Sequence, residues 1–147
     1  LHRWKFNLKT GATTEEDICN ETIEFGDINQ HIAGLEHRYT YSMVPTKGHF
    51  TFDGITKHDH QKKSLTKYIF PEHIFISEVS FAPKTNGIDE DDGYLVTISN
   101  DVREKSSSCL LFDAKNIEQG PVCDIPLPHQ ICSGTHATWA QKSDLKS

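Results

Sequence analysis

The chain has 147 residues, the size of one domain or less. Lys and Arg number 15 and Asp and Glu number 21, so the formal net charge is −6, and this mildly acidic balance disfavours a nucleic-acid partner. Hydrophobic residues make up 35% of the chain, which is too many for a disordered protein, and no apolar run reaches the roughly 18–20 residues of a transmembrane helix.

The first residues carry no recognisable start signal. The chain begins at Leu1 and continues directly into Trp4–Leu8, without a cap or a targeting sequence. We therefore expect it to be the tail of a longer protein whose true N-terminus lies upstream. A cytoplasmic location is expected, and the missing N-terminus leaves targeting open.

Short segments rich in β-branched and aromatic residues alternate with turn-forming residues, and helical periodicity is nearly absent. The turns between them are marked by Gly, Pro, Asn and Asp, as in Pro45–Gly48 and Lys84–Gly87. This pattern predicts an all-β fold. In chain order, the predicted strands are Arg3–Leu8, Asp17–Phe25, Arg38–Met43, Gly48–Asp53, Leu65–Phe70, Ile74–Ser77, Gly93–Ser99, Ser108–Asp113 and Val122–Pro126.

An internal repeat is the second organising feature. Asn7, Asp59 and Asp113 each stand where a strand enters a polar turn, and they are 52 and then 54 residues apart. This spacing is close to the roughly 50 residues of some propeller blades. A coincidence among hairpins is the alternative. If the repeat is real, the chain holds two to three blades, whereas a closed propeller needs roughly four to eight.

Two clusters of potential metal ligands are better explained as surface turns. His58-Asp59-His60 lies in the charged segment Lys57–Lys63, where lysines would repel a cation and no third ligand is near. The acidic run Asp89–Asp92 lacks the alternating ligands and the distal Glu of an EF-hand loop, so a solvated turn is favoured over a calcium site. The four cysteines form no C-x-x-C pair, and reduced thiols are expected.

His136 and two glutamates are the candidate site residues. His136 lies among small residues, which leaves its imidazole room to approach another group. Glu24 ends an apolar strand and Glu78 lies between apolar residues, where a carboxylate costs free energy unless it is paired. Either one could accept the N–H of a ligating imidazole. The alternatives are a purely structural His136 and strand alternation that points both glutamates to solvent.

Several motifs share their order and spacing with one known family. They are Ile23–Phe25, Arg38–Ser42, Glu90–Thr97, Leu110–Ile117 and Leu127–Trp139. Together they resemble the C-terminal part of the carotenoid oxygenases. The resemblance covers essentially the whole chain and is weaker between Gly48 and Phe75. Residues 133–136, with Trp4–Asn7, look most like the bacterial lignostilbene dioxygenases of that family.

The resemblance implies a fold and a chemistry. The family folds as a seven-bladed β-propeller, so residues 1–147 would form its C-terminal two to three blades. Four His bind a non-haem Fe(II) on the propeller axis, and Glu side chains hold three of them. By position, His136 matches the last iron ligand, and Glu24 and Glu78 match two of the glutamates. The other three ligands would lie upstream, outside this chain.

The implied reaction is oxidative cleavage of a conjugated C=C bond by O₂, which gives two carbonyl products. Its partners would be O₂ and an apolar aromatic or polyene substrate: a lignostilbene, a phenylpropenoid or an apocarotenoid. Two alternatives remain, a non-catalytic propeller binding module and an iron-dependent isomerase of the same fold. Two positions depart from the family pattern, because Gly26 replaces the usual Pro after Glu24-Phe25 and Ser77 replaces the common Gly before Glu78. Which of Glu24 and Glu78 orients His136 is left open.

Overall fold

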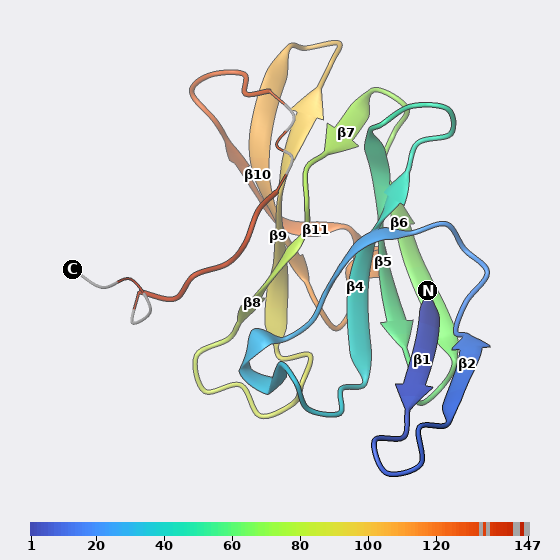
Figure 1. Ribbon diagram of the computed structural model, residues 1–147. Helices are drawn as coiled ribbons and strands as arrows, with labels where there is room; N and C mark the ends of the chain where they lie inside the picture. Colours follow the sequence, from blue (N-terminus) through green and yellow to red (C-terminus); the bar gives the residue numbers. More distant parts are fainter. Residues whose placement is uncertain (133, 135, 143–144, 146–147) are drawn as a thin grey trace.

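The computed structural model describes residues 1–132, 134, 136–142 and 145. Its regular structure is β-sheet apart from two short 3-10 helices, Gln30–Ile32 and Ile117–Gln119, so the all-β prediction is confirmed (Figure 1). The strands are β1 (His2–Phe6), β2 (Thr13–Asp17), β3 (Glu24–Asp27), β4 (Tyr39–Pro45), β5 (Phe52–Asp59), β6 (Ser64–Ile69), β7 (Ile74–Ile76), β8 (Ser80–Pro83), β9 (Gly93–Asp101), β10 (Ser106–Asp113) and β11 (Pro121–Pro126).

The main sheet consists of two four-stranded antiparallel meanders. One runs β3–β4–β5–β6 and the other β8–β9–β10–β11. Strand β7 pairs with both β5 and β9 and joins the meanders into one nine-stranded sheet, which Figure 1 shows as two units side by side. Strands β1 and β2 form a separate hairpin.

Period-two alternation places the core. Along β9, Leu95, Thr97 and Ser99 are buried, whereas the residues between them are only half-buried. Side chains of both meanders meet in one apolar cluster, in which Tyr41 and Phe81 stack with their ring centroids 5.6 Å apart. Gly93 at the start of β9 allows this packing, because a Cβ there would lie 2.3 Å from Cζ of Phe81.

The predicted turn-entry role of Asn7, Asp59 and Asp113 is confirmed. Each side chain accepts hydrogen bonds from backbone N–H groups two or three residues further on, at 3.0–3.1 Å. Asp101 does the same at the β9–β10 turn, outside the proposed repeat. The turn motif is therefore a property of these hairpins and does not by itself define a blade.

Three sequence predictions were wrong in detail. The strand predicted for Asp17–Phe25 is broken, because the chain leaves the β1–β2 hairpin after Asp17 and joins the main sheet only at Glu24. The strand predicted for Gly48–Asp53 begins only at Phe52, after a turn in which Gly48 has φ +81°. The charged segment after Lys57 is not all turn, because residues 57–59 are buried in β5.

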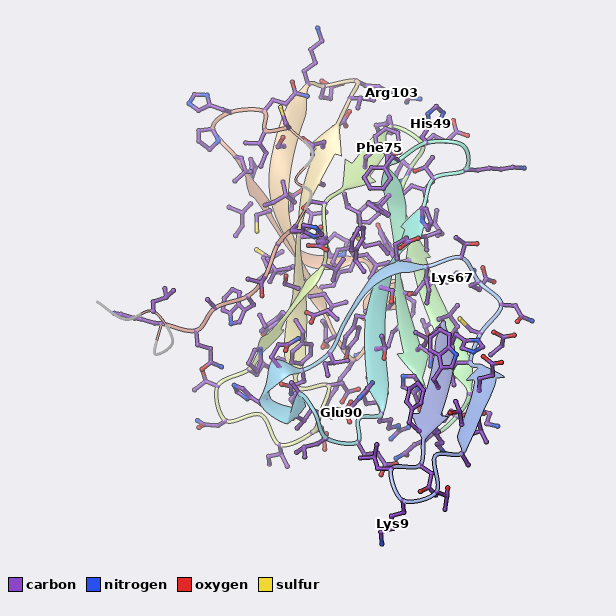
Figure 2. All side chains as sticks on the ribbon, viewed as in Figure 1. Lys9, His49, Lys67, Phe75, Glu90 and Arg103 are labelled. Carbon is purple, nitrogen blue, oxygen red and sulfur yellow. The ribbon has the colours of Figure 1, made fainter. Side chains whose placement is uncertain are left out.

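The acidic run before β9 was also misjudged as a solvated turn. Asp91 is only 8% exposed, and it accepts a 2.7 Å hydrogen bond from Nζ of Lys57 in β5. Both oxygens of Glu90, which is labelled in Figure 2, accept from the backbone N–H of Arg38, the residue before β4. Asp92 pairs with Lys115, which holds the pKa of its carboxyl well below the usual range. The run fastens the two meanders together.

Candidate metal centre

Glu78 lies in a β-bulge. Strands β7 and β8 pair with the same edge of β9, with Ile76 opposite Ser99 and Ser80 opposite Val96. Three residues of this interrupted strand therefore oppose two residues of β9. A bulge of this kind changes the direction in which a side chain points, because the extra residue cannot join the ladder.

Ser77 holds the bulge in place. Its backbone N–H donates to the carbonyl of Ile98 at 2.9 Å, and its Oγ accepts from the N–H of Ile98 at 3.2 Å. The hydroxyl of Thr97 donates to the Ser77 carbonyl at 2.9 Å. The Ser77 side chain thus supplies a hydrogen bond that a glycine could not.

Glu24 stands at a second bulge. Glu24 pairs with Met43 and Asp27 with Tyr41, so two residues of β3 oppose one of β4. Phe25 within this bulge has φ +51°, a left-handed backbone that is rare for a bulky residue. Glu24 and Glu78 are 54 residues apart, the same interval as Asp59 and Asp113. The two bulges therefore support a repeat of the meander, beyond the turn motif alone.

His136 is brought to Glu78 by the segment that follows β11. Its Nδ1 lies 3.0 Å from Oε1 of Glu78, and Oε2 of the same carboxylate accepts from the N–H of Ala137 at 2.5 Å. The ring of Phe25 meets the imidazole edge-on, with the centroids 5.5 Å apart. Glu78 is 12% exposed and His136 71%, so a nearly buried carboxylate holds an exposed imidazole.

This geometry determines which nitrogen of His136 can bind a metal. A carboxylate that accepts a hydrogen bond from the Nδ1–H leaves the lone pair of Nε2 available. Among the described residues, no hydrogen-bond partner contacts Nε2. The arrangement fits a metal ligand held by its outer carboxylate.

The structure pairs His136 with Glu78 and not with Glu24. Glu24 is exposed, and within the described residues no hydrogen bond or ion pair involves its carboxylate. Sequence reasoning missed Phe25 and the N–H of Ala137. A backbone amide leaves no signal in a sequence, whereas Phe25 adjoins Glu24 and could have been considered. Ser133 and Thr135 of the same motif lie outside the described residues.

The other histidine cluster has a different character. His58 is 2% exposed, and among the described residues its Nδ1 has no hydrogen-bond partner. Nε2 of His60 lies 2.8 Å from Oγ1 of Thr40. Burial, with His58 and His37 nearby, lowers the pKa of His60 to about 4. In the part of the chain that the structure describes, no group of three or more His, Cys, Asp or Glu is arranged to hold a metal.

A small apolar pocket of about 200 Å³ adjoins Glu78. Its walls include Val96, Ile98, Ala137 and Trp139. The apolar lining lies directly beside the carboxylate that holds His136.

The chain is similar to several known proteins. The sequence model of the retinal pigment epithelial membrane protein family matches residues 1–141. A carotenoid 9,10(9′,10′)-cleavage dioxygenase of Phaseolus vulgaris is 30% identical over 99% of this chain, and a carotenoid cleavage oxygenase of Mycobacterium tuberculosis is 30% identical over 95%. The chain spans 30% and 29% of these two relatives' lengths.

Solved structures show the fold. A variant of Synechocystis apocarotenoid oxygenase superposes with a TM-score of 0.87 at 24% identity, over 96% of this chain and 30% of that one. The cobalt-substituted Synechocystis protein gives a TM-score of 0.88 at the same identity and coverage. These proteins are β-propellers, so the prediction of propeller blades is confirmed. In the described residues, no helix combines the length and apolar character needed to cross a membrane.

Proposed function

We propose that this chain, which belongs to the retinal pigment epithelial membrane protein family of carotenoid-cleaving oxygenases, supplies one wall of an iron centre. The complete protein would be a non-haem Fe(II) dioxygenase that cleaves a conjugated C=C bond with O₂ into two carbonyl products. His136 would bind the metal through Nε2, with Glu78 accepting its Nδ1 proton. Glu24 would hold a further ligand His contributed by another part of the protein.

The single observation that carries the proposal is that the Glu78 carboxylate accepts two hydrogen bonds, one from the His136 ring and one from the backbone N–H of Ala137. One carboxylate holds both the ring and the backbone next to it, so the imidazole has little freedom to turn away. Neutral imidazoles suit iron and leave open positions when they do not fill the coordination sphere. Ferrous iron, when bound, supplies the redox chemistry by which O₂ reacts with a double bond.

The residues around His136 would also shape the substrate side. Val96, Ile98 and Trp139 line the pocket beside Glu78 and offer an apolar surface. Such a surface matches a polyene or stilbene better than a charged substrate, because burying unpaired charge is costly. The names of the relatives favour a carotenoid-type polyene, and a lignostilbene is the second candidate.

The test is His136→Ala in the complete protein, compared with His129→Ala as the matched control. His129 is exposed on the same segment after β11. We expect stoichiometric iron in the wild type and in His129→Ala, and loss of iron and of turnover in His136→Ala. Normal iron content in His136→Ala would overturn the assignment.

The substrate class is tested by O₂ uptake with an apocarotenoid and with a hydroxystilbene. Two carbonyl products and O₂ consumption with either one support a cleaving dioxygenase. Bound iron with a rearranged product and no O₂ uptake would instead identify an isomerase. A wild-type protein free of iron would identify a non-catalytic module.

A further inference from the structure

The segment that carries His136 is anchored at two places in the sheet. Beyond β11, described residues of this segment contact the sheet on both sides of β9. Glu78, on one side of β9, holds His136 and Ala137. Ser107, in β10 on the other side of β9, holds the segment nearer to β11.

Ser107 contacts the segment through both its backbone and its side chain. Its carbonyl accepts from the N–H of Leu127 at 2.8 Å, and its Oγ accepts from the N–H of Ile131 at 3.0 Å. Its hydroxyl proton goes to Oδ1 of Asn100, the cross-strand neighbour, at 2.7 Å. Ser107 is 2% exposed and Asn100 is 8% exposed, so both partners of this chain of hydrogen bonds are fixed in the sheet.

We propose that Ser107, oriented by Asn100, is a positioning residue that sets the place of His136 through the N–H of Ile131. The proposal rests on the proposed function, since it concerns the metal-ligating role of His136.

The geometry explains why an anchor at this point matters. Five Cα–Cα steps separate Ile131 from His136, and they can reach at most about 17 Å when extended. The two anchored strands flank β9 and are about 10 Å apart. The tether is therefore short, with limited slack. Without the bond to Ile131, the free tether would run nine Cα–Cα steps from Leu127, whose N–H the Ser107 carbonyl still holds, and nearly doubling a tether lowers the closed fraction about two- to threefold.

Replacing the buried Ser107 by Ala should cost more than replacing it by Thr, because only Thr keeps a hydroxyl. Ser107→Ala would leave Oδ1 of the buried Asn100 without this partner, which is unfavourable, and would release the N–H of Ile131. Ser107→Thr restores a hydroxyl at the same carbon. Ser99→Ala is the matched control, because Ser99 in β9 is also buried and its hydroxyl donates to a backbone carbonyl, that of Ser108.

The experiment measures two quantities in the complete protein. Amide hydrogen exchange at Ile131 reports the anchor directly, and the rate of iron loss to a chelator reports the position of His136. For Ser107→Ala we expect about tenfold faster exchange at Ile131, as for one lost hydrogen bond, and iron loss about two- to threefold faster. Ser107→Thr should restore both, and Ser99→Ala should change neither. Wild-type exchange or wild-type iron retention in Ser107→Ala would overturn the proposal.

A second pair of variants tests the same Ile131–Ser107 hydrogen bond by changing Ile131, and it leaves the residues of the sheet unchanged. Ile131→Pro removes the donating N–H, whereas Ile131→Ala removes only a half-exposed side chain. We expect faster iron loss only in the proline variant, and equal rates in the two variants would contradict the anchor. Failure of the proposed function is distinguishable, because it would show as a wild type without iron while the exchange at Ile131 still reports Ser107.

Discussion

The carboxylate of Glu78 assigns roles to the two nitrogens of His136. It accepts from Nδ1 with one oxygen and from the N–H of Ala137 with the other. Since a ligating imidazole needs one nitrogen free and the other hydrogen-bonded, this contact is the one that an outer carboxylate would make in the proposed metal site. The ring of Phe25 contacts the His136 imidazole edge-on and restricts its movement on a further side. Phe25 itself has a strained, left-handed backbone conformation.

His60 shows the opposite use of a histidine. Its burial and the neighbouring His58, His37 and Arg3 lower its pKa to about 4, although Asp59 acts in the other direction. Arg3 from β1 lies 3.4 Å from Nδ1 of His60. The folded protein therefore keeps this imidazole neutral at a pH where the unfolded chain already takes up a proton.

The consequence is a loss of stability in mild acid. The folded pKa of about 4 is below the unfolded value of 6.5, so the contribution of His60 is complete above pH 6.5 and is lost as the pH falls toward 4. We expect the unfolding free energy of the complete protein to fall over this range. In His60→Gln the fall should be shallower by at most about 1.4 kcal/mol per pH unit, the value for one proton. His49→Gln, at an exposed turn, is the control, and equal slopes in the wild type and in His60→Gln would contradict the prediction.

At the scale of elements, the two meanders are joined by ionic contacts as well as by β7. Lys57 of β5 and Asp91 before β9 form an ion pair whose side chains are 10% and 11% exposed. The ammonium of Lys57 also lies over the ring of Tyr39, 4.2 Å from its centroid. Such a pair ties the loop before β9 to the neighbouring meander at a defined register.

We expect Lys57→Met to destabilise the complete protein by about 3–5 kcal/mol, because it leaves a buried carboxylate without its partner. The double variant Lys57→Met/Asp91→Leu should cost less than the sum of the single changes. Lys67→Met is the control. Lys67 is labelled in Figure 2, and its pair with Glu21 is exposed, so about 0–1 kcal/mol is expected. Urea unfolding measures the free energy of unfolding of the wild type, Lys57→Met, Asp91→Leu, the double variant and Lys67→Met. A double-variant cost equal to the sum of the two single costs would refute the coupling.

At the scale of the whole molecule, strand β11 forms an exposed edge of the main sheet. All six residues of β11 are exposed, including Val122 at 57% and Ile125 at 48%. Trp4 and Phe6 of β1 are 57% and 68% exposed. Exposed apolar strands at an open edge favour association with other chains.

The 147-residue chain expressed alone should therefore associate and bind no iron, because it carries one of the proposed ligands. Val122→Lys/Ile125→Lys should reduce association by placing charge on the edge strand. Ile88→Lys is the control, since Ile88 is 94% exposed in the loop before β9 and belongs to no strand. Size-exclusion chromatography measures the outcome, and a monodisperse wild-type chain would contradict the expectation.

The amino-acid sequence by itself determined the all-β class, most strand positions and the candidates His136, Glu24 and Glu78. Strand alternation and turn residues are local signals, so β9, β10 and β11 were located to within a few residues. Charge misled the prediction at Lys57 and Asp91, because each looks solvated until its distant partner is known.

Only the tertiary structure decided which glutamate holds His136 and what keeps that segment in place. Glu78 and His136 are 58 residues apart, and a one-residue bulge directs the carboxylate toward the imidazole. Ser107 and Ile131 meet only because the chain folds back after β11. Side-chain direction at a bulge and the path of an extended segment depend on the pairing of distant strands, and the residues that set them carry no local signature.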